Sequence, residues 1–209
     1  MKYFKYPISF AILIGVPIVY HAQTIACGAI HSLAFRSDTL QGWGYNAFGQ
    51  LGNGTTTNSS VPIQIPGVKG IISMDGGGQH HTLIAKNDST VWSWGYNSNG
   101  QLGNGTTTGS IVPLQVPGIT SVKIVNAGGQ HSLSIKNNGT LWTWGDNTHG
   151  QLGDGTVIQR TLPVQVNGIS GVKYVVGGLG HSMAVKNDNT LWTWGSNNLG
   201  ELGDGTNIE

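Results

Sequence analysis

The chain has 209 residues, of which 34 are glycine and only 9% are charged, and its net charge is +1 at pH 7. This balance offers no basic surface for nucleic acid, which proteins bind through clustered lysine and arginine. Seven tryptophans and recurring aliphatic residues exclude an intrinsically disordered chain. A single cysteine excludes intrachain disulfides, and glycine-rich turns between short apolar runs indicate all-β structure.

The N-terminal segment, residues 1–23, is predicted to be a secretory signal peptide. Lys2 and Lys5 precede an apolar run over residues 8–20, and the small residue Ala22 follows. This order of features is typical of such leaders. The run is shorter than the roughly 20 residues of a membrane span, which makes a retained anchor the weaker alternative. We therefore expect a secreted, periplasmic or cell-surface protein that meets the membrane only during secretion.

Cys27 has two interpretations. It lies four residues before His31, as Ala127 lies four before His131, which predicts a small buried position in a repeated strand. The alternative is a lipid anchor, because residues 24–27 distantly resemble a lipoprotein cleavage box. A lipid there would remove the first strand from its sheet, so we favour the buried position.

From this point the sequence repeats with a period of about 50 residues, which is typical of propellers, solenoids and arrays. The recurring features are His81, His131 and His181, the tryptophans Trp94, Trp144 and Trp194, and Gly-Gln-Leu-Gly or Gly-Glu-Leu-Gly beginning at Gly49, Gly100, Gly150 and Gly200. Such a chain is usually a scaffold whose function lies in the loops that differ between copies.

The third copy shows the strands of one repeat. Residues 122–126 form a short apolar run, and residues 131–136 and 140–144 alternate with the period of two that a half-buried strand requires. Residues 137–139, Asn-Asn-Gly, are predicted to form the hairpin turn between them. A fourth strand is expected at residues 162–166. Four short strands per repeat are the arrangement of one propeller blade.

The motifs Gly-Gly-x-His-Ser-Leu, Asn-x-Gly-Thr-Leu-Trp-Thr-Trp-Gly and Asn-x-x-Gly-Gln-Leu-Gly-x-Gly-Thr together resemble the regulator-of-chromosome-condensation repeat. The resemblance covers residues 24–209 and implies an all-β propeller with four short antiparallel strands per blade. We expect repeats at approximately 24–74, 75–124, 125–175 and 176–209, the last truncated, and the leader indicates a secreted bacterial member.

Two departures from the regular pattern carry expectations. The stretch 76–81 has one extra residue relative to 127–131, which suggests a local bulge. The sequence stops at Glu209, before any fourth strand of copy four, so we expect an incomplete ring. The chain is then a portion of a longer protein, or an arc closed by another chain, and self-association through the truncated blade is expected.

No residue pattern indicates catalysis, a metal site or a cofactor. The repeated histidines would come from different blades, too far apart to share one ion, and are expected to be hydrogen-bonded within their own blades. The acids alternate with neutral turn-forming residues between copies, which suits Asx turns rather than acid–base chemistry. This set comprises Asp75, Asp88, Asp154, Asp188 and Asp204.

Two sets of loops vary between copies, after the Trp-Gly pair and after Gly-x-Gly-Thr. Their best contact candidates are Tyr45, Phe48, Tyr96, His149 and Arg160. We predict a secreted, non-catalytic scaffold that binds a protein through these loops. Three alternatives stay open: an enzyme inhibitor similar to beta-lactamase inhibitory protein, a guanine-nucleotide exchange factor as in nuclear members of the family, and a carbohydrate-binding module.

Overall fold

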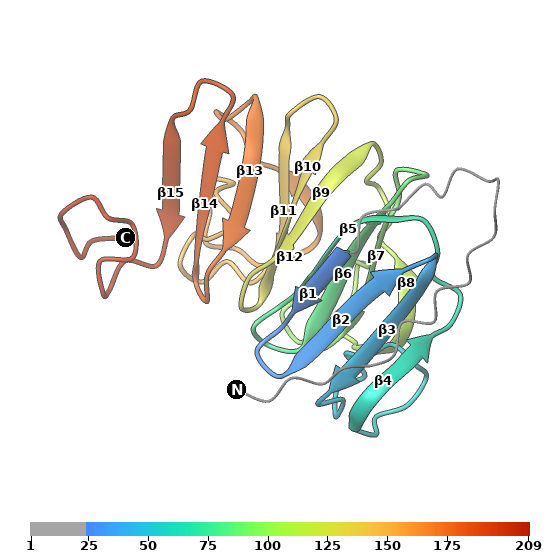
Figure 1. Ribbon diagram of the computed structural model, residues 1–209. Coiled ribbons are helices and arrows are strands. Elements are labelled where there is room, and N and C mark those ends of the chain that lie inside the picture. The colour runs from blue at the N-terminus through green and yellow to red at the C-terminus, as the bar shows by residue number, and fades with distance from the viewer. Residues whose placement is uncertain (1–23) are drawn as a thin grey trace, which may run out of the picture.

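The computed structural model describes residues 24–209, and this part consists of four antiparallel sheets without a helix. The sheets follow one another along an open arc (Figure 1). Each sheet is one blade of a β-propeller, and consecutive blades meet through their first strands, β1, β5, β9 and β13. The predicted all-β propeller with an incomplete ring is therefore confirmed. The predicted signal peptide lies outside the described residues.

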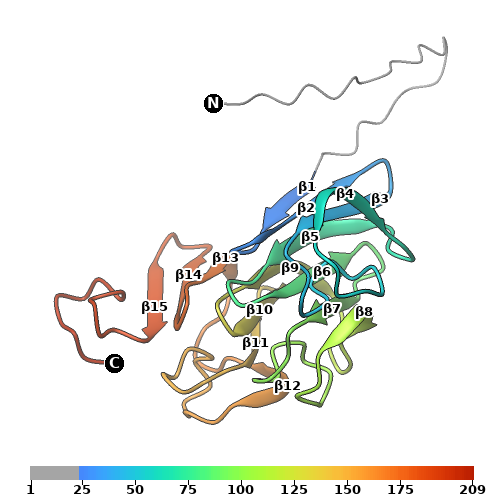
Figure 2. The same ribbon diagram turned by 90° about the horizontal axis from the view of Figure 1, so that it is seen from below.

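Blades 1 to 3 have four strands each, paired in chain order, and blade 4 has three. Blade 1 comprises β1 (Thr24–Cys27), β2 (His31–Arg36), β3 (Thr39–Gly44) and β4 (Ser59–Ile65). Blade 2 comprises β5 (Ile71–Gly76), β6 (His81–Lys86), β7 (Val91–Gly95) and β8 (Ser110–Gln115). Blade 3 comprises β9 (Val122–Ala127), β10 (His131–Lys136), β11 (Leu141–Gly145) and β12 (Arg160–Gln165). Blade 4 comprises β13 (Val172–Gly177), β14 (His181–Lys186) and β15 (Leu191–Gly195). Seen from below, β15 and the segment after it project from one end of the molecule (Figure 2).

Local hydrogen bonds close the turn between the second and third strands of blades 2 to 4. In blade 3, Asn138 Oδ1 accepts from the main-chain N–H of Thr140 at 3.1 Å and from its hydroxyl at 2.8 Å. Asp88 and Asp188 hold the same position and make the same pair of bonds. These acids are Asx-turn residues, as predicted.

Asp75 does not follow that prediction, because it lies within β5 rather than in a turn. Its Oδ2 accepts from the main-chain N–H of Ala127, in the first strand of the next blade, at 3.0 Å. Asn126 repeats the contact one blade further on, accepting from the N–H of Gly177 at 2.6 Å. Asp and Asn are interchangeable here because either side chain supplies an oxygen to the neighbouring strand.

The cores lie between blades rather than inside single sheets. Between blades 2 and 3, Leu83 and Val91 pack against Val122 and Trp144, all almost fully buried. Each buried tryptophan removes a large apolar area from water. Trp144 of a recurring Trp-Gly pair thus belongs to this core, and Trp94 is buried in the same way between blades 1 and 2.

A hydrogen-bond network crosses each junction between blades. At the junction of blades 2 and 3, His81 Nε2 lies 3.2 Å from Ser132 Oγ. The serine hydroxyl donates to the main-chain carbonyl of Gln101 at 2.7 Å, and Trp144 Nε1 donates to the same carbonyl at 2.9 Å. Because the hydroxyl has one proton and donates it to the carbonyl, it accepts from His81, whose proton is therefore on Nε2.

The other two junctions repeat this network. The first consists of His31, Thr82, Gln50 and Trp94, and the third of His131, Ser182, Gln151 and Trp194. The expectation that each histidine bonds within its own blade is wrong for His31, His81 and His131, because the hydroxyl partner of each lies 51 residues away in the next blade.

The same junctions need a glycine in the connection that carries the acceptor. A Cβ on Gly103 would lie 2.6 Å from Trp144 Nε1, and its φ of +68° also favours glycine. Gly103 thus leaves the space in which the indole of the next blade reaches the Gln101 carbonyl.

Cys27 is exposed, so the prediction of a buried position is wrong. Its counterpart Ala127 is 7% exposed. The difference arises because the first strand of each later blade is covered by the preceding blade. In blade 2, for example, a Cβ on Gly76 of β5 would lie 2.9 Å from the main chain of Cys27 in blade 1. Among the described residues no blade precedes blade 1, and Cys27 is left uncovered. In the same part of the chain, no helix is long and apolar enough to cross a membrane.

Replacing Ser132 by alanine should lower the free energy of unfolding by about 1–3 kcal/mol, because the buried N–H of His81 loses its acceptor. Ser134 on the same strand is the matched control, since it is equally buried and its hydroxyl has no partner within residues 24–209. Ser134→Ala should leave the free energy of unfolding unchanged or slightly raise it. Urea denaturation followed by tryptophan fluorescence measures both, and equal losses in the two variants would contradict the network's role.

Acid should destabilise the fold well before the carboxylates titrate. Burial lowers the pKa of His31, His81 and His131 to about 4, 3 and 4, from 6.5. Above pH 6.5 these imidazoles are neutral in both the folded and the unfolded chain, and their contribution to the free energy of unfolding is fully present. As the pH falls from 6.5 towards 4, only the unfolded chain takes up protons, so the free energy of unfolding falls by up to about 1.4 kcal/mol per pH unit for each histidine. Urea denaturation at pH 7, 6 and 5 measures this, and equal stability at the three values would refute it.

Candidate functional site

One end of the propeller carries all the loops that the sequence marks as variable. The first turn and the third connection of a blade leave the same end of the sheet, because neighbouring strands are antiparallel. We call this end the loop face. Its first turns are residues 28–30, 77–80, 128–130 and 178–180, and its third connections are 45–58, 96–109 and 146–159, with 196–209 following β15. The two variable loop sets are thus the two halves of a single connection, and Tyr45 and Arg160 belong to the same face.

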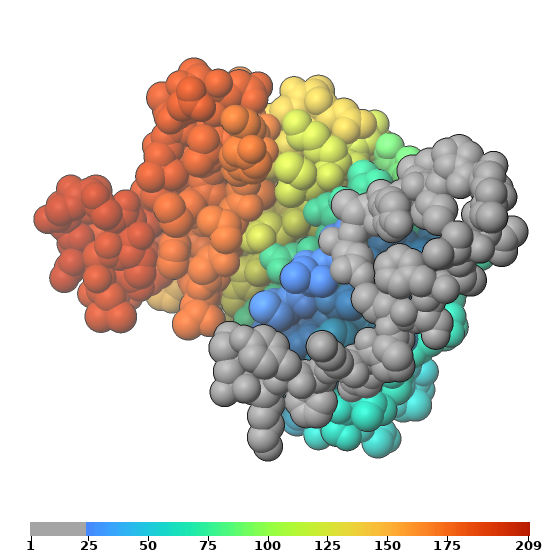
Figure 3. All heavy atoms as spheres, in the orientation of Figure 1, coloured from blue at the N-terminus to red at the C-terminus, as the bar shows by residue number. Residues whose placement is uncertain are grey.

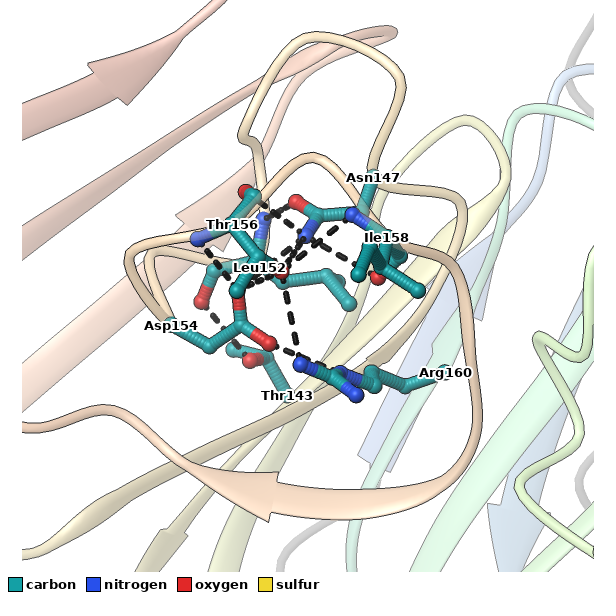
Figure 4. A network of polar contacts seen from close by, with 7 residues as sticks. All are labelled: Thr143, Asn147, Leu152, Asp154, Thr156, Ile158 and Arg160. Atoms are coloured by element: carbon teal, nitrogen blue, oxygen red, sulfur yellow. Dashed lines mark hydrogen bonds and ion pairs between the residues drawn. The ribbon is translucent and has the colours of Figure 1, made fainter.

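A buried asparagine holds each third connection in shape (Figure 4). In blade 3, Asn147 Nδ2 donates to Asp154 Oδ1 at 3.1 Å and to the carbonyls of Thr156 and Ile158 at 2.9 and 3.1 Å. Its Oδ1 accepts from the N–H of Leu152 at 2.9 Å. Equivalent bonds are made by Asn46, Asn97 and Asn197. The connections therefore share one rigid framework on which the remaining residues vary.

Four aromatic rings meet on the loop face across the junction of blades 1 and 2, and we call them the aromatic cluster: Tyr45, Phe48, His80 and Tyr96. Phe48 is central, stacked on His80 with ring centroids 5.2 Å apart and planes 7° apart, and edge-on to Tyr96 at 4.8 Å. Tyr45 contacts Phe48 at 6.2 Å and His80 at 5.4 Å. Phe48 is nevertheless 39% exposed, so the cluster presents an apolar surface to solvent.

His80 enters the cluster because blade 2 has one residue more in its first turn than blades 3 and 4. The extra residue was expected to form a bulge in the stretch 76–81, and this expectation is wrong. The strand β5 ends at Gly76, β6 begins at His81, and the additional length lies in the turn, where His80 has φ of +65°. This left-handed conformation is uncommon for a residue other than glycine. Its carbonyl accepts from the N–H of Tyr96 at 2.9 Å, which fixes the turn against the neighbouring connection.

The aromatic cluster carries no formal charge at neutral pH. Burial lowers the pKa of His80 below its usual value of 6.5, so the imidazole is neutral there. The four side chains offer ring faces, ring edges and two phenol hydroxyls. This set can bind a partner through packing and a few hydrogen bonds, but it contains no general base poised beside a nucleophile.

Polar side chains continue the loop face beyond the aromatic cluster. Gln130, in the first turn of blade 3, bonds Gln79 of blade 2 and accepts from Asn99 Nδ2 at 2.7 Å. Gln130 also borders a cavity of about 490 Å³ over blades 3 and 4. His149 and Leu179 line the same cavity.

The structure divides the five predicted contact residues into two groups. Tyr45, Phe48 and Tyr96 lie together in the aromatic cluster. His149 lies apart, with Nδ1 2.7 Å from Glu209 Oε1. Arg160 Nε donates to Asp154 Oδ2 at 2.8 Å, so its guanidinium is bound to its own connection (Figure 4).

Two residues of the loop face, the half-buried His80 and the exposed Leu179, were missed in the sequence, and both come from first turns. His80 was detectable as the residue by which copy two exceeds the others. Leu179 is 75% exposed and stands where copy three has Gly129, a signal that comparing the short turns residue by residue would have shown. Within residues 24–209, no three His, Cys, Asp or Glu side chains lie close enough to hold a metal ion.

Asn147→Ala should cost about 2–4 kcal/mol of unfolding free energy, because several buried main-chain groups lose their partner together. Asp154→Asn is the matched comparison, since Asn53 and Asn104 hold the same position in other blades. It removes only the ion pair with Arg160 and should cost at most about 1 kcal/mol. Thermal or urea unfolding ranks the two variants, and a larger loss for Asp154→Asn would disprove the framework role of Asn147.

Comparison with known proteins supports this architecture. A family model for the regulator of chromosome condensation (RCC1) repeat matches residues 39–84, 88–135 and 138–185, and a second model of that repeat matches 71–101, 122–151 and 172–201. The ultraviolet-B receptor UVR8 of Arabidopsis thaliana is 35% identical over 104 residues, which are 48% of this chain and 24% of UVR8. The human E3 ubiquitin-protein ligase HERC2 is 33% identical over 109 residues, which are 50% of this chain and 2% of HERC2.

Solved structures agree on the fold. Yeast RCC1 (Prp20), solved bound to Kap60, matches with a TM-score of 0.79 at 22% identity, over 94% of this chain and 48% of that one. Human WBSCR16 matches with a TM-score of 0.74 at 23% identity, over 83% of this chain and 46% of that one. The chain thus spans about half of these propellers and a quarter or less of the curated relatives. With its repeats matched by the family model and its blades folded in this way, the chain belongs to the RCC1 repeat family.

Proposed function

We propose that this chain is a secreted, non-catalytic propeller scaffold that binds a protein partner through its loop face, with the aromatic cluster as the centre of contact. The observation that carries the proposal is the position of Phe48. It is held by three neighbouring rings and yet is 39% exposed on a surface built from two blades.

The physics of protein interfaces favours such a cluster. Aromatic side chains bring a large contact area at a small cost in conformational entropy, and they dominate the binding free energy of many interfaces. The rings of the aromatic cluster already restrict one another, so little further ordering is needed on binding. The framework asparagines Asn46 and Asn97 fix the connections that carry Tyr45, Phe48 and Tyr96.

RCC1-type propellers bind protein partners. Yeast RCC1 was solved with Kap60, and a second structure of that protein, Prp20p, was described together with its binding to Gsp1p and histones. Those partners belong to the yeast protein. We transfer to this chain only the use of the propeller as a binding scaffold.

The absence of catalysis is part of the proposal, and the chemistry of the described residues supports it. The network histidines are buried and neutral at pH 7. Asp88, Asp154 and Asp188 are engaged in turns. The match to HERC2 covers 2% of that ligase, so no ligase activity is transferred. Export rests on the leader-like residues 1–23.

Replacing Tyr45, Phe48 and Tyr96 together with serine should abolish partner binding and leave the fold intact, because their side chains lie outside the junction cores. Central aromatic anchors contribute about 2 kcal/mol or more each, so affinity should fall by at least about a thousandfold. The matched control is Val157→Ser with Ile158→Ser, which removes exposed apolar side chains (68% and 60% exposed) from the equivalent connection of blade 3.

The measurement is affinity capture with each purified variant, separately from extracellular and cytosolic fractions of the source cells, followed by calorimetric titration of the captured protein. The partner should come from the extracellular fraction and bind the control variant normally. Unchanged affinity in the serine variant would refute the aromatic cluster as the site. A partner found only in the cytosolic fraction would refute secretion, and turnover of a bound ligand would refute the non-catalytic role.

A further inference from the structure

Basic residues that are far apart in the sequence gather at one end of the propeller. We call it the hairpin end, because it consists of the turns between second and third strands and of the links between blades. The turns are residues 37–38, 87–90, 137–140 and 187–190, and the links are 66–70, 116–121 and 166–171. This end lies opposite the loop face. The turns β10–β11 and β14–β15 stand at the top of Figure 1 and form the yellow and orange upper edge of the space-filling view (Figure 3).

Seven of the eight basic residues in 24–209 lie at the hairpin end or within two residues of it. They are Arg36, Lys69, Lys86, Lys123, Lys136, Lys173 and Lys186. Three acidic residues share this end, Asp38, Asp88 and Asp188, so its formal net charge is +4. The sequence indicated no basic surface because these residues are scattered along it, and the structure corrects that interpretation.

The loop face has the opposite charge. By the same criterion it holds Arg160 and six acidic residues, which give a formal net charge of −5. These acids are Asp75, Asp146, Asp154, Glu201, Asp204 and Glu209. An extended negative surface therefore attracts the hairpin end and repels the loop face, and this field gives the approaching molecule one preferred orientation.

Most cations of the hairpin end are free to meet such a surface. Lys86 and Lys186 are each bonded to an aspartate of the following turn at 3.0 Å. Five others form no ion pair within residues 24–209: Arg36, Lys69, Lys123, Lys136 and Lys173. The ammonium of Lys136 lies 5.0 Å from the centre of the Trp142 ring, which holds the lysine in place without neutralising its charge.

The distribution of these cations favours an extended surface over a compact ligand or a nucleic acid. A cavity of about 700 Å³ at this end has Asp38 in its lining and neither lysine nor arginine. The free cations are spread over blades 1, 3 and 4 and the link to blade 2, so a plane can meet them together and a small anion cannot. Single-stranded nucleic acid needs exposed aromatic faces for its bases, whereas the tryptophans of this end lie beneath Lys86, Lys136 and Lys186.

We propose that the hairpin end binds a membrane surface whose lipid headgroups carry net negative charge, with the loop face turned away from the lipid. The ammonium and guanidinium groups approach the headgroup phosphates, and each basic residue near such a surface contributes about fivefold in affinity. Binding is therefore reversible and is weakened by salt. The sequence led us to expect contact with a membrane only during secretion, and the proposal adds a second, peripheral contact. It does not depend on a protein partner, and it leaves the loop face free for one.

The test uses the purified protein expressed from the full 209-residue sequence. A hairpin-end variant carries Lys69→Gln with Lys136→Gln. The matched control carries Thr107→Glu with Val157→Glu, which lowers the net charge by the same amount at exposed positions of the loop face. The probes are vesicles of phosphatidylcholine alone and vesicles with equal amounts of phosphatidylcholine and phosphatidylglycerol. Residues 1–23 are common to all three proteins, and the neutral vesicles measure what they contribute.

In co-sedimentation at about 0.1 M salt, the unmodified chain and the control should bind the mixed vesicles more tightly than the neutral ones. The hairpin-end variant should bind the mixed vesicles about thirtyfold more weakly, from two losses of about fivefold each. Raising the salt to about 0.5 M should remove the difference between the two kinds of vesicle, because the charges are then screened over a few ångströms.

A second readout needs no substitution. Cys27 is the sole cysteine, is exposed, and ends β1 next to the first turn of the loop face. A polyethylene glycol maleimide attached to it should leave vesicle binding unchanged, because the loop face points away from the lipid.

Four results would each overturn the proposal. Equal binding to neutral and mixed vesicles would remove the electrostatic contact. Equal weakening in the hairpin-end variant and the control would assign the binding to net charge rather than to one end. Tighter binding to duplex DNA than to mixed vesicles at the same salt would assign the hairpin end to nucleic acid. Loss of binding after modification of Cys27 would place the loop face, and not the hairpin end, against the lipid.

Discussion

One main-chain carbonyl at each junction determines how the blades fit together. The carbonyl of Gln101 accepts from a hydroxyl and an indole of the next blade at once, and the hydroxyl in turn accepts from His81. Such bonds in a buried place cost free energy if any member is displaced, because a desolvated polar group is left without a partner. The apolar residues around them supply most of the driving force for packing, but they tolerate small shifts. The shared carbonyl does not, and it therefore sets the rotation and height of each blade relative to the one before.

The separation of scaffold and site follows from that arrangement. Every repeated residue is committed to a strand, a turn, a junction or the asparagine framework, and none of these positions can vary freely. What remains is the exposed part of the first turns and third connections, all on the loop face. A single inserted residue in one turn, His80, suffices to complete the aromatic cluster from two blades. The exposed residues of the loop face can thus differ between copies without disturbing the junctions.

The sequence predicted features whose cause is local and missed those whose cause lies in the next blade. Alternation and the Asx turn at Asn138 depend on residues a few positions apart, so strands and turns could be placed correctly. The partner of His81 could not, because a period of 50 residues is consistent with a bond inside the blade and with one across the junction. The prediction placed Cys27 correctly in a strand but wrongly in a buried position, because burial at that position comes from a neighbouring blade. The aromatic cluster was predicted in part. Tyr45, Phe48 and Tyr96 were chosen by residue type, whereas the place of His80 in the cluster depends on the conformation of its turn, which the sequence does not show.

The shared design of the junctions has a consequence for how such proteins change over generations. Each blade offers a histidine and a carbonyl on one side and a hydroxyl and an indole on the other, so any blade can follow any other. Recombination between misaligned repeats, which adds or deletes a whole number of repeat units, preserves the network around the shared carbonyl at the new boundary. Gene segments of this kind can therefore lengthen or shorten by whole blades, whereas the number of blades that closes a ring stays set by the rotation that each junction imposes.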